Sequence, residues 1–146
     1  MNPSNHNNFT VKFANVNGTG SSSANSLFMK SIFRMGIPVV GKNYFPSNIQ
    51  GLPTWYEVRV SENGYLAPSG EVDIMVAMNA QTYEKDIAEI VPGGYLIYDS
   101  TWSRKELKIR KDVTVLGVPL AQMCNENFDT ARARTLMKNT AYVGVL

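Results

Sequence analysis

Short apolar runs alternate along the chain with apolar residues at helical spacing, and this alternation is typical of an α/β fold. An apolar run at 11–16 predicts the first strand. The helix that follows should end before Gly36, because glycine favours the position after a helix and Pro38 prevents continuation. Ser21 or Ser22 is expected to cap this helix, since a hydroxyl can accept a hydrogen bond from an unpaired helix N–H. Its apolar face is predicted from four residues: Leu27, Phe28, Ile32 and Met35.

Later segments repeat the alternation. The run at 72–78 is almost wholly apolar, as expected for a strand buried on both faces. The Asn63-Gly64 pair favours a tight turn, so the alternating strand at 54–60 is expected to return through 65–67 as a hairpin. Asn79 is expected to cap a short helix in which Tyr83, Ile87 and Ile90 share a face. Further strands are predicted at 38–45, 95–98 and 113–118, and a last helix is predicted after Asp129.

These elements predict a three-layer, Rossmann-like α/β domain with a largely parallel sheet and helices on both faces. The strand at 38–45 is expected to run parallel to the first strand. Residues 1–8 are polar and are expected to form a disordered tail, which leaves 9–146 as the domain. The last helix reaches the final residues without a cap or a polar tail, so we expect the domain to be truncated at its C-terminal end.

Composition narrows the function classes. Of the 146 residues, 44% are hydrophobic and 18% are charged, and the net charge of +2 is too small to indicate nucleic acid or a membrane surface as a partner. Cys124 is the single cysteine, which excludes a disulfide framework and a thiolate metal site. We expect it to be a small buried thiol. The polar N-terminus lacks the features of a signal peptide, and a cytoplasmic location is expected.

The turn at 17–25 is the main candidate for ligand binding. A strand, a small-residue turn and a helix in succession direct backbone N–H groups toward one point, which favours an anion. A dinucleotide-binding turn would need a third glycine where Ser23 stands. It would also need an acid about 20 residues further on, where Lys42 and Asn43 stand; Lys42 leaves a phosphorylated cofactor open. A phosphate-binding P-loop would need a lysine, which Gly20-Ser21-Ser22 lacks.

Catalytic chemistry has little support in the sequence. Cys124 has no histidine base nearby, because the single histidine is His6 in the polar tail. Asp73, Asp99 and Glu57 are scattered rather than clustered, so no metal site is predicted.

Two polar loops follow strands that are expected to end at the same edge of the sheet as the turn. Open α/β sheets bind ligands at this edge. One loop covers 47–51 and the other covers 99–102, where Trp102 is expected to be a core or interface residue. We predict a hydrogen-bonding rim for a ligand or a partner, made by Gly18, Thr19, Gly20 and Ser21 with Ser47, Asn48, Gln50 and Gly51.

Five stretches together resemble the gamma-type domain of 2-oxoacid:ferredoxin (acceptor) oxidoreductases. They are 17–25, 36–39, 45–51, 73–79 and 92–100, and the resemblance extends over the chain after the tail. It is closest to the form in which this domain is fused at the N-terminus of the alpha subunit, as in enzymes of the 2-oxoglutarate type.

The resemblance implies a role within a larger enzyme. Such enzymes oxidatively decarboxylate a 2-oxoacid to an acyl-CoA with thiamine diphosphate, Mg, iron–sulfur clusters and coenzyme A, and they pass electrons to ferredoxin. The expected partners are the thiamine-binding alpha and beta domains or subunits. The gamma domain supplies no catalytic residue of its own and is implied in subunit assembly and coenzyme A access.

The turn departs from the family pattern Gly-x-Gly-Gly-Gln-Gly. Gly18 and Gly20 persist, but serines occupy 21–23, so the backbone approaches a ligand less closely. Asn48 also stands where the family often has an acid. The alternative function is a stand-alone nucleotide- or coenzyme-binding module, and a third possibility is a purely structural domain.

Overall fold

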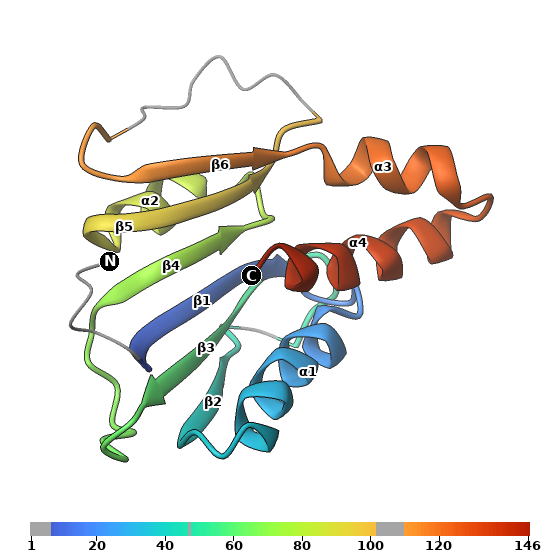
Figure 1. The fold of residues 1–146 in the computed structure, drawn as a ribbon. Helices are drawn as coiled ribbons and strands as arrows, with labels where there is room; N and C mark the ends of the chain where they lie inside the picture. Colours follow the sequence, from blue (N-terminus) through green and yellow to red (C-terminus); the bar gives the residue numbers. More distant parts are fainter. Residues whose placement is uncertain (1–6, 47, 102–109) are drawn as a thin grey trace.

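The computed structural model describes residues 7–46, 48–101 and 110–146, in which a six-stranded sheet carries helices on both faces (Figure 1). The predicted three-layer α/β architecture is confirmed. In chain order the elements are β1 (Asn8–Val16), α1 (Ser21–Arg34), β2 (Val39–Tyr44), β3 (Pro53–Ser61), β4 (Val72–Ala77), α2 (Tyr83–Ala88), β5 (Ile90–Asp99), β6 (Thr114–Val118), α3 (Leu120–Asn127) and α4 (Ala131–Val145).

The sheet has the strand order β2-β3-β1-β4-β5-β6. β1, β4, β5 and β6 are parallel neighbours, as predicted for the apolar runs. β3 is antiparallel to both of its neighbours, β1 and β2. β2 therefore runs in the direction of β1, as expected, but β3 separates the two strands.

The predicted hairpin across Asn63-Gly64 is wrong. Gly64 does adopt a turn conformation with φ +75°, but the residues at 65–67 do not form a strand. β3 already pairs along its full length with β1, from Asn8 opposite Ser61 to Val16 opposite Pro53, and it pairs with β2 on its other side. Both edges of β3 are occupied, so a returning strand has no place beside it.

α1 and α4 cover one face of the sheet and α2 covers the other (Figure 1). Phe13 on β1 anchors the first of these layers, with its ring centroid 5.7 Å from those of Phe28 on α1 and Tyr142 on α4. Such aromatic pairs add about 0.5–1.5 kcal/mol each beyond the burial of their area. On the opposite face, Met75 is fully buried and belongs to the same apolar cluster as Ile87 on α2.

The start and the buried face of α1 differ from the prediction. The N-cap residue is Gly20 and it makes no side-chain cap hydrogen bond, whereas Ser21 is the first helical residue. Leu27 and Met35 are exposed, while the polar Asn25 is buried. Phe28 and Ile32 of the predicted face do pack in the core, whereas Ala24 and Asn25 are buried in place of Leu27 and Met35. Gly36 ends the helix with φ +80°, as predicted.

The later helices are only partly as expected. α2 has Thr82 as its N-cap residue, while Asn79 forms a turn before it by accepting a hydrogen bond from the backbone N–H of Gln81 (3.0 Å). Ile90 already belongs to β5. α4 follows Asp129 as predicted, whereas α3 was not anticipated from the sequence. Of the predicted tail, residues 1–6 lie outside the described part of the chain, and Asn8 begins β1.

Candidate functional site

The turn between β1 and α1 has a backbone that requires glycine. Gly18 and Gly20 have φ of +87° and +77°, values that side chains of L-residues rarely tolerate. Between them, the Thr19 hydroxyl donates to the carbonyl oxygen of Val16 (2.8 Å), which closes the turn on the end of β1. Because Gly20 offers no cap, the first N–H groups of α1 lack a side-chain acceptor at the helix end. This end of the helix therefore carries the partial positive charge that attracts acceptors and anions.

The loop between β2 and β3 contacts this turn, so the structure brings together two segments predicted to form the rim. Asn17 donates its backbone N–H to Leu52 O (2.8 Å) and its side-chain amide to Ile49 O (3.1 Å), and it accepts from the backbone N–H of Gly51 (3.0 Å). Gln50 covers Gly18 so closely that an added Cβ there would lie 2.6 Å from Gln50 Cγ.

Of the other residues predicted for this loop, Asn48 is exposed and Ser47 lies outside the described residues. Trp102, from the second predicted loop, also lies outside them.

The loop after β5 has a structural role in the described chain. Asp99 is buried, and its Oδ1 accepts hydrogen bonds from the backbone N–H and the hydroxyl of Thr101 (3.1 and 2.6 Å) and from Ala121 N (3.3 Å). Its Oδ2 lies 3.9 Å from Lys138 Nζ. These contacts go to α3 and α4 rather than to the glycine turn, so Asp99 organises the start of α3.

α4 also contacts the turn, at residues other than those that the β2–β3 loop contacts. The buried Asn139 donates its side-chain amide to Thr19 O (2.8 Å), across 120 residues of sequence. Leu136 lies above Gly20, where an added Cβ would lie 2.6 Å from its Cδ2 atom. Neither residue was among the predicted site residues, because an asparagine and a leucine on a helix carry no distinguishing pattern.

Beside the turn lies a cavity of about 240 Å³, which we call the amide cavity. Asparagines and serines supply most of its polar wall, and aromatic residues supply the rest. Its lining consists of Asn15, Asn17, Gly18, Gly20, Ser21, Ser22, Asn25, Asn43, Phe45, Thr54, Trp55 and Tyr56. Among the described residues of this lining there is no lysine, arginine or carboxylate, so the recognition that they offer depends on neutral hydrogen-bonding groups and on the end of α1.

Asn15 on β1 has hydrogen-bonding capacity that its neighbours do not use. The residue is 2% exposed, and its Nδ2 atom makes no hydrogen bond of normal geometry. It lies near enough to the Tyr142 hydroxyl to lower that group's pKa, although burial has the larger effect and raises the pKa of Tyr142 overall. An amide nitrogen carries two N–H donors, so at least one of them is without an acceptor even with Tyr142 beside it. A buried donor of this kind costs about 1–3 kcal/mol unless an acceptor reaches it.

Tyr142 fixes the neighbouring wall. Its hydroxyl donates to Asn25 Oδ1 (2.7 Å), and both residues are buried between α1 and α4. This contact orients the amide of Asn25 and explains why a polar residue occupies the buried face of α1.

The described residues offer little for catalysis. Within 7–46, 48–101 and 110–146, no group of three His, Cys, Asp or Glu side chains is arranged to hold a metal ion. Cys124 is buried, as predicted, and burial raises the pKa of its thiol. None of the helices in these ranges combines the length and apolar character needed to cross a bilayer. The arrangement at the turn is suited to holding a ligand or a partner by hydrogen bonds.

The fold and the site define a class of protein: a three-layer α/β domain with polar loops gathered at the carboxyl end of β1. A family model described as "Pyruvate ferredoxin/flavodoxin oxidoreductase" matches residues 10–146. The chain therefore belongs to this family, which confirms the resemblance seen in the sequence.

Individual relatives agree with this assignment. A curated relative, 2-oxoacid:ferredoxin oxidoreductase 2 subunit alpha from Aeropyrum pernix, is 32% identical over 82 residues. That match covers 56% of this chain and 13% of the relative, so the chain corresponds to a small part of that protein.

Solved structures share the fold. The gamma subunit of a keto/oxoacid ferredoxin oxidoreductase from Geobacter sulfurreducens has a TM-score of 0.73 at 17% identity, over 93% of this chain and 73% of its own. The 2-oxoglutarate:ferredoxin oxidoreductase from Magnetococcus marinus, solved with 2-oxoglutarate, coenzyme A and succinyl-CoA bound, also has a TM-score of 0.73, at 20% identity. That match covers 97% of this chain and 32% of the other.

Proposed function

We propose that this chain is a non-catalytic gamma-type domain of a 2-oxoacid:ferredoxin oxidoreductase that converts 2-oxoglutarate or a similar 2-oxoacid to an acyl-CoA. In this proposal the domain contributes to subunit assembly and to coenzyme A access. Membership of the family supports the setting, and the Magnetococcus structure, with coenzyme A and succinyl-CoA bound, supports the choice of ligand. The proposed partners are thiamine-binding alpha and beta domains or subunits, with ferredoxin reached through the complex.

The cofactors of such a complex differ in how well they fit this chain. An iron–sulfur cluster needs several cysteine thiolates, and the chain has only Cys124, which is buried. We therefore assign the clusters, and thiamine diphosphate with Mg, to other domains. Coenzyme A fits better, because its amide carbonyls are acceptors and the amide cavity offers donors. When bound, coenzyme A supplies the thiol that accepts the acyl group.

The coenzyme A proposal rests on one observation: two groups of hydrogen-bond donors without side-chain acceptors belong to residues that line the same cavity. The first turn of α1 begins without a side-chain cap, and Asn15, whose buried amide nitrogen has no hydrogen-bond partner, is a lining residue of the same cavity. An acceptor that entered the cavity would satisfy both, which would offset the cost of leaving a buried donor without a partner. The neutral lining favours an amide carbonyl or a single anionic group over a multiply charged one.

A pair of serine variants tests the proposal without damaging the fold. Ser22 and Ser23 are both exposed in the first turn of α1, but only Ser22 lines the amide cavity. Aspartate at either position is expected to stabilise the helix by about 0.3–1 kcal/mol through the helix dipole. S22D should place a carboxylate in the cavity and raise the KM for coenzyme A of the assembled enzyme, whereas S23D should leave it unchanged. An equal KM in S22D, S23D and the wild type would contradict the proposal.

A further inference from the structure

A second cavity lies on the α2 side of the sheet, opposite the layer formed by α1 and α4. It measures about 350 Å³, within the range of about 300–1,000 Å³ typical of small-molecule sites. Two lysines and an apolar, largely aromatic wall line it, and we call it the lysine–aromatic cavity. The lining residues are Lys12, Tyr44, Phe45, Pro46, Trp55 and Lys85.

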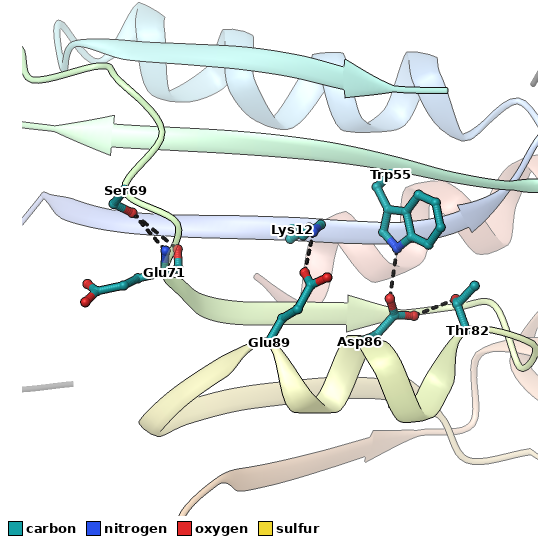
Figure 2. Close-up of polar contacts among 7 residues, drawn as sticks. All are labelled: Lys12, Trp55, Ser69, Glu71, Thr82, Asp86 and Glu89. Atoms are coloured by element: carbon teal, nitrogen blue, oxygen red, sulfur yellow. Dashed lines mark hydrogen bonds and ion pairs between the residues drawn. The ribbon is translucent and has the colours of Figure 1, made fainter. Parts of the chain in front are cut away.

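Two of these residues are held in place by neighbours on and beside α2 (Figure 2). The indole N–H of Trp55 donates to Asp86 Oδ1 (2.8 Å), and the Thr82 hydroxyl donates to Asp86 Oδ2 (2.6 Å). Lys12 forms an ion pair with Glu89 at the other end of the same short helix. A site whose side chains are fixed by such second contacts loses little side-chain entropy when a ligand binds.

The two lysines of this cavity differ in whether a nearby carboxylate already engages them. Glu89 engages Lys12, and the sheet register places Glu57 beside both Lys12 and Lys42. Lys85 instead lies over the ring of Trp55, with its Nζ atom 4.7 Å from the ring centroid. Lys85 forms no ion pair within the described residues, so its ammonium group can accept an anion.

We propose that the lysine–aromatic cavity binds a nucleoside phosphate. The exposed Phe45 and the half-buried Tyr44 offer aromatic surface to the base, and Lys85, which has no ion-pair partner among the described residues, receives the phosphate. The ligand is either a free nucleotide or the nucleotide end of a larger cofactor, since both present the same ring and phosphate. This inference does not require coenzyme A to bind at the turn. Phe45 and Trp55 belong to the linings of both cavities, so the lysine variants, rather than the Trp55 emission alone, locate the site.

A titration of the 146-residue chain tests the proposal. Trp55 lines the cavity and the only other tryptophan is Trp102, so W102F isolates the fluorescence of Trp55. Three probes are compared: AMP, adenosine and inorganic phosphate. AMP should change the Trp55 emission and bind at least about tenfold more tightly than adenosine or phosphate, because only AMP engages both walls. The same titration with coenzyme A and with dephospho-coenzyme A then shows whether the site prefers the nucleotide end of a cofactor to free AMP.

A matched pair of lysine variants locates the effect. Lys85 and Lys30 are both exposed helical lysines, and Lys30 lies on α1 away from the cavity lining. K85A should weaken AMP binding about fivefold or more, the loss of about 1 kcal/mol expected for a charge–charge contact near a protein surface. K30A should bind AMP as the wild type does, and both variants should keep the far-UV circular dichroism of the folded chain.

Three results would overturn the inference: no AMP binding by the folded chain, equal binding of AMP and adenosine, or equal binding by K85A and the wild type. The result of this titration can be distinguished from the result of the coenzyme A experiment at the turn. If S22D raises the KM for coenzyme A while K85A leaves AMP binding unchanged, the proposed function stands and this inference fails. The reverse pattern supports the nucleotide site alone.

Discussion

Replacement of Gly20 by alanine tests how strongly the turn depends on its backbone and on α4. Gly20 has φ +77°, and a non-glycine residue in this region costs about 1–2 kcal/mol. The new Cβ would lie 2.6 Å from Leu136 Cδ2. Leu136 is 43% exposed and its terminal methyl group can move, so we expect the clash to add less than about 1 kcal/mol. G20A should therefore lower the free energy of unfolding by about 1–3 kcal/mol.

Gly36 supplies the matched control. It has nearly the same φ, +80°, but an added Cβ there meets no atom within 4 Å. G36A should cost only the backbone term of about 1–2 kcal/mol, and the difference between the two variants should report the contact with Leu136. Urea unfolding followed by circular dichroism, with unchanged m-values, measures both costs.

Either of two results would refute this reasoning. If G20A unfolds at the same urea concentration as the wild type, or if L136A fails to relieve the excess cost in G20A over G36A, then α4 does not constrain the turn as described. A double-mutant cycle between G20A and L136A gives the coupling directly.

Three further predictions concern buried polar groups. Burial raises the pKa of Asp86, so the fold favours its protonated form, and this contribution to stability is lost as pH rises from the ordinary aspartate pKa through the raised value. D86N should remove this pH dependence of the free energy of unfolding, measured by urea titration. D86A should lower the free energy of unfolding by about 1–3 kcal/mol at neutral pH, because the Trp55 indole N–H loses its acceptor. Equal stability of D86A and D86N would contradict this. N139A should cost about 0.5–1.5 kcal/mol and speed amide hydrogen exchange in the glycine turn, because Thr19 O loses its partner; unchanged exchange would contradict the contact. Cys124 should react with an alkylating reagent only after unfolding, because burial shields the thiol and raises its pKa; rapid labelling of the folded chain would contradict this.

The sequence predicted features that depend on local rules. Gly36 ended α1 as expected, because a left-handed residue after a helix needs no tertiary contact. The turn at Gly18 and the loop at Gly51 were also placed together correctly. Both adjoin the same edge of the sheet, and their hydrogen bonds through Asn17 follow from that placement.

Features that depend on distant partners were not predicted. β3 inserts between β1 and β2, and no local pattern in 54–60 distinguishes this pairing from a hairpin. Asn139 reaches Thr19 across 120 residues, and the unused amide of Asn15 is visible only when its neighbours are known. The lysine–aromatic cavity was missed for the same reason, since Lys12 and Lys85 are far apart in sequence.

The most direct test of the central claim is a map of backbone amide shifts in the ¹⁵N-labelled chain on addition of coenzyme A. The account predicts saturable shifts at Gly18, Gly20 and Ser22, together with the side-chain amide of Asn15, because these groups line the amide cavity. S22D should abolish these shifts and S23D should preserve them. Shifts that avoid the turn, or that persist unchanged in S22D, would contradict the claim that this turn receives the ligand.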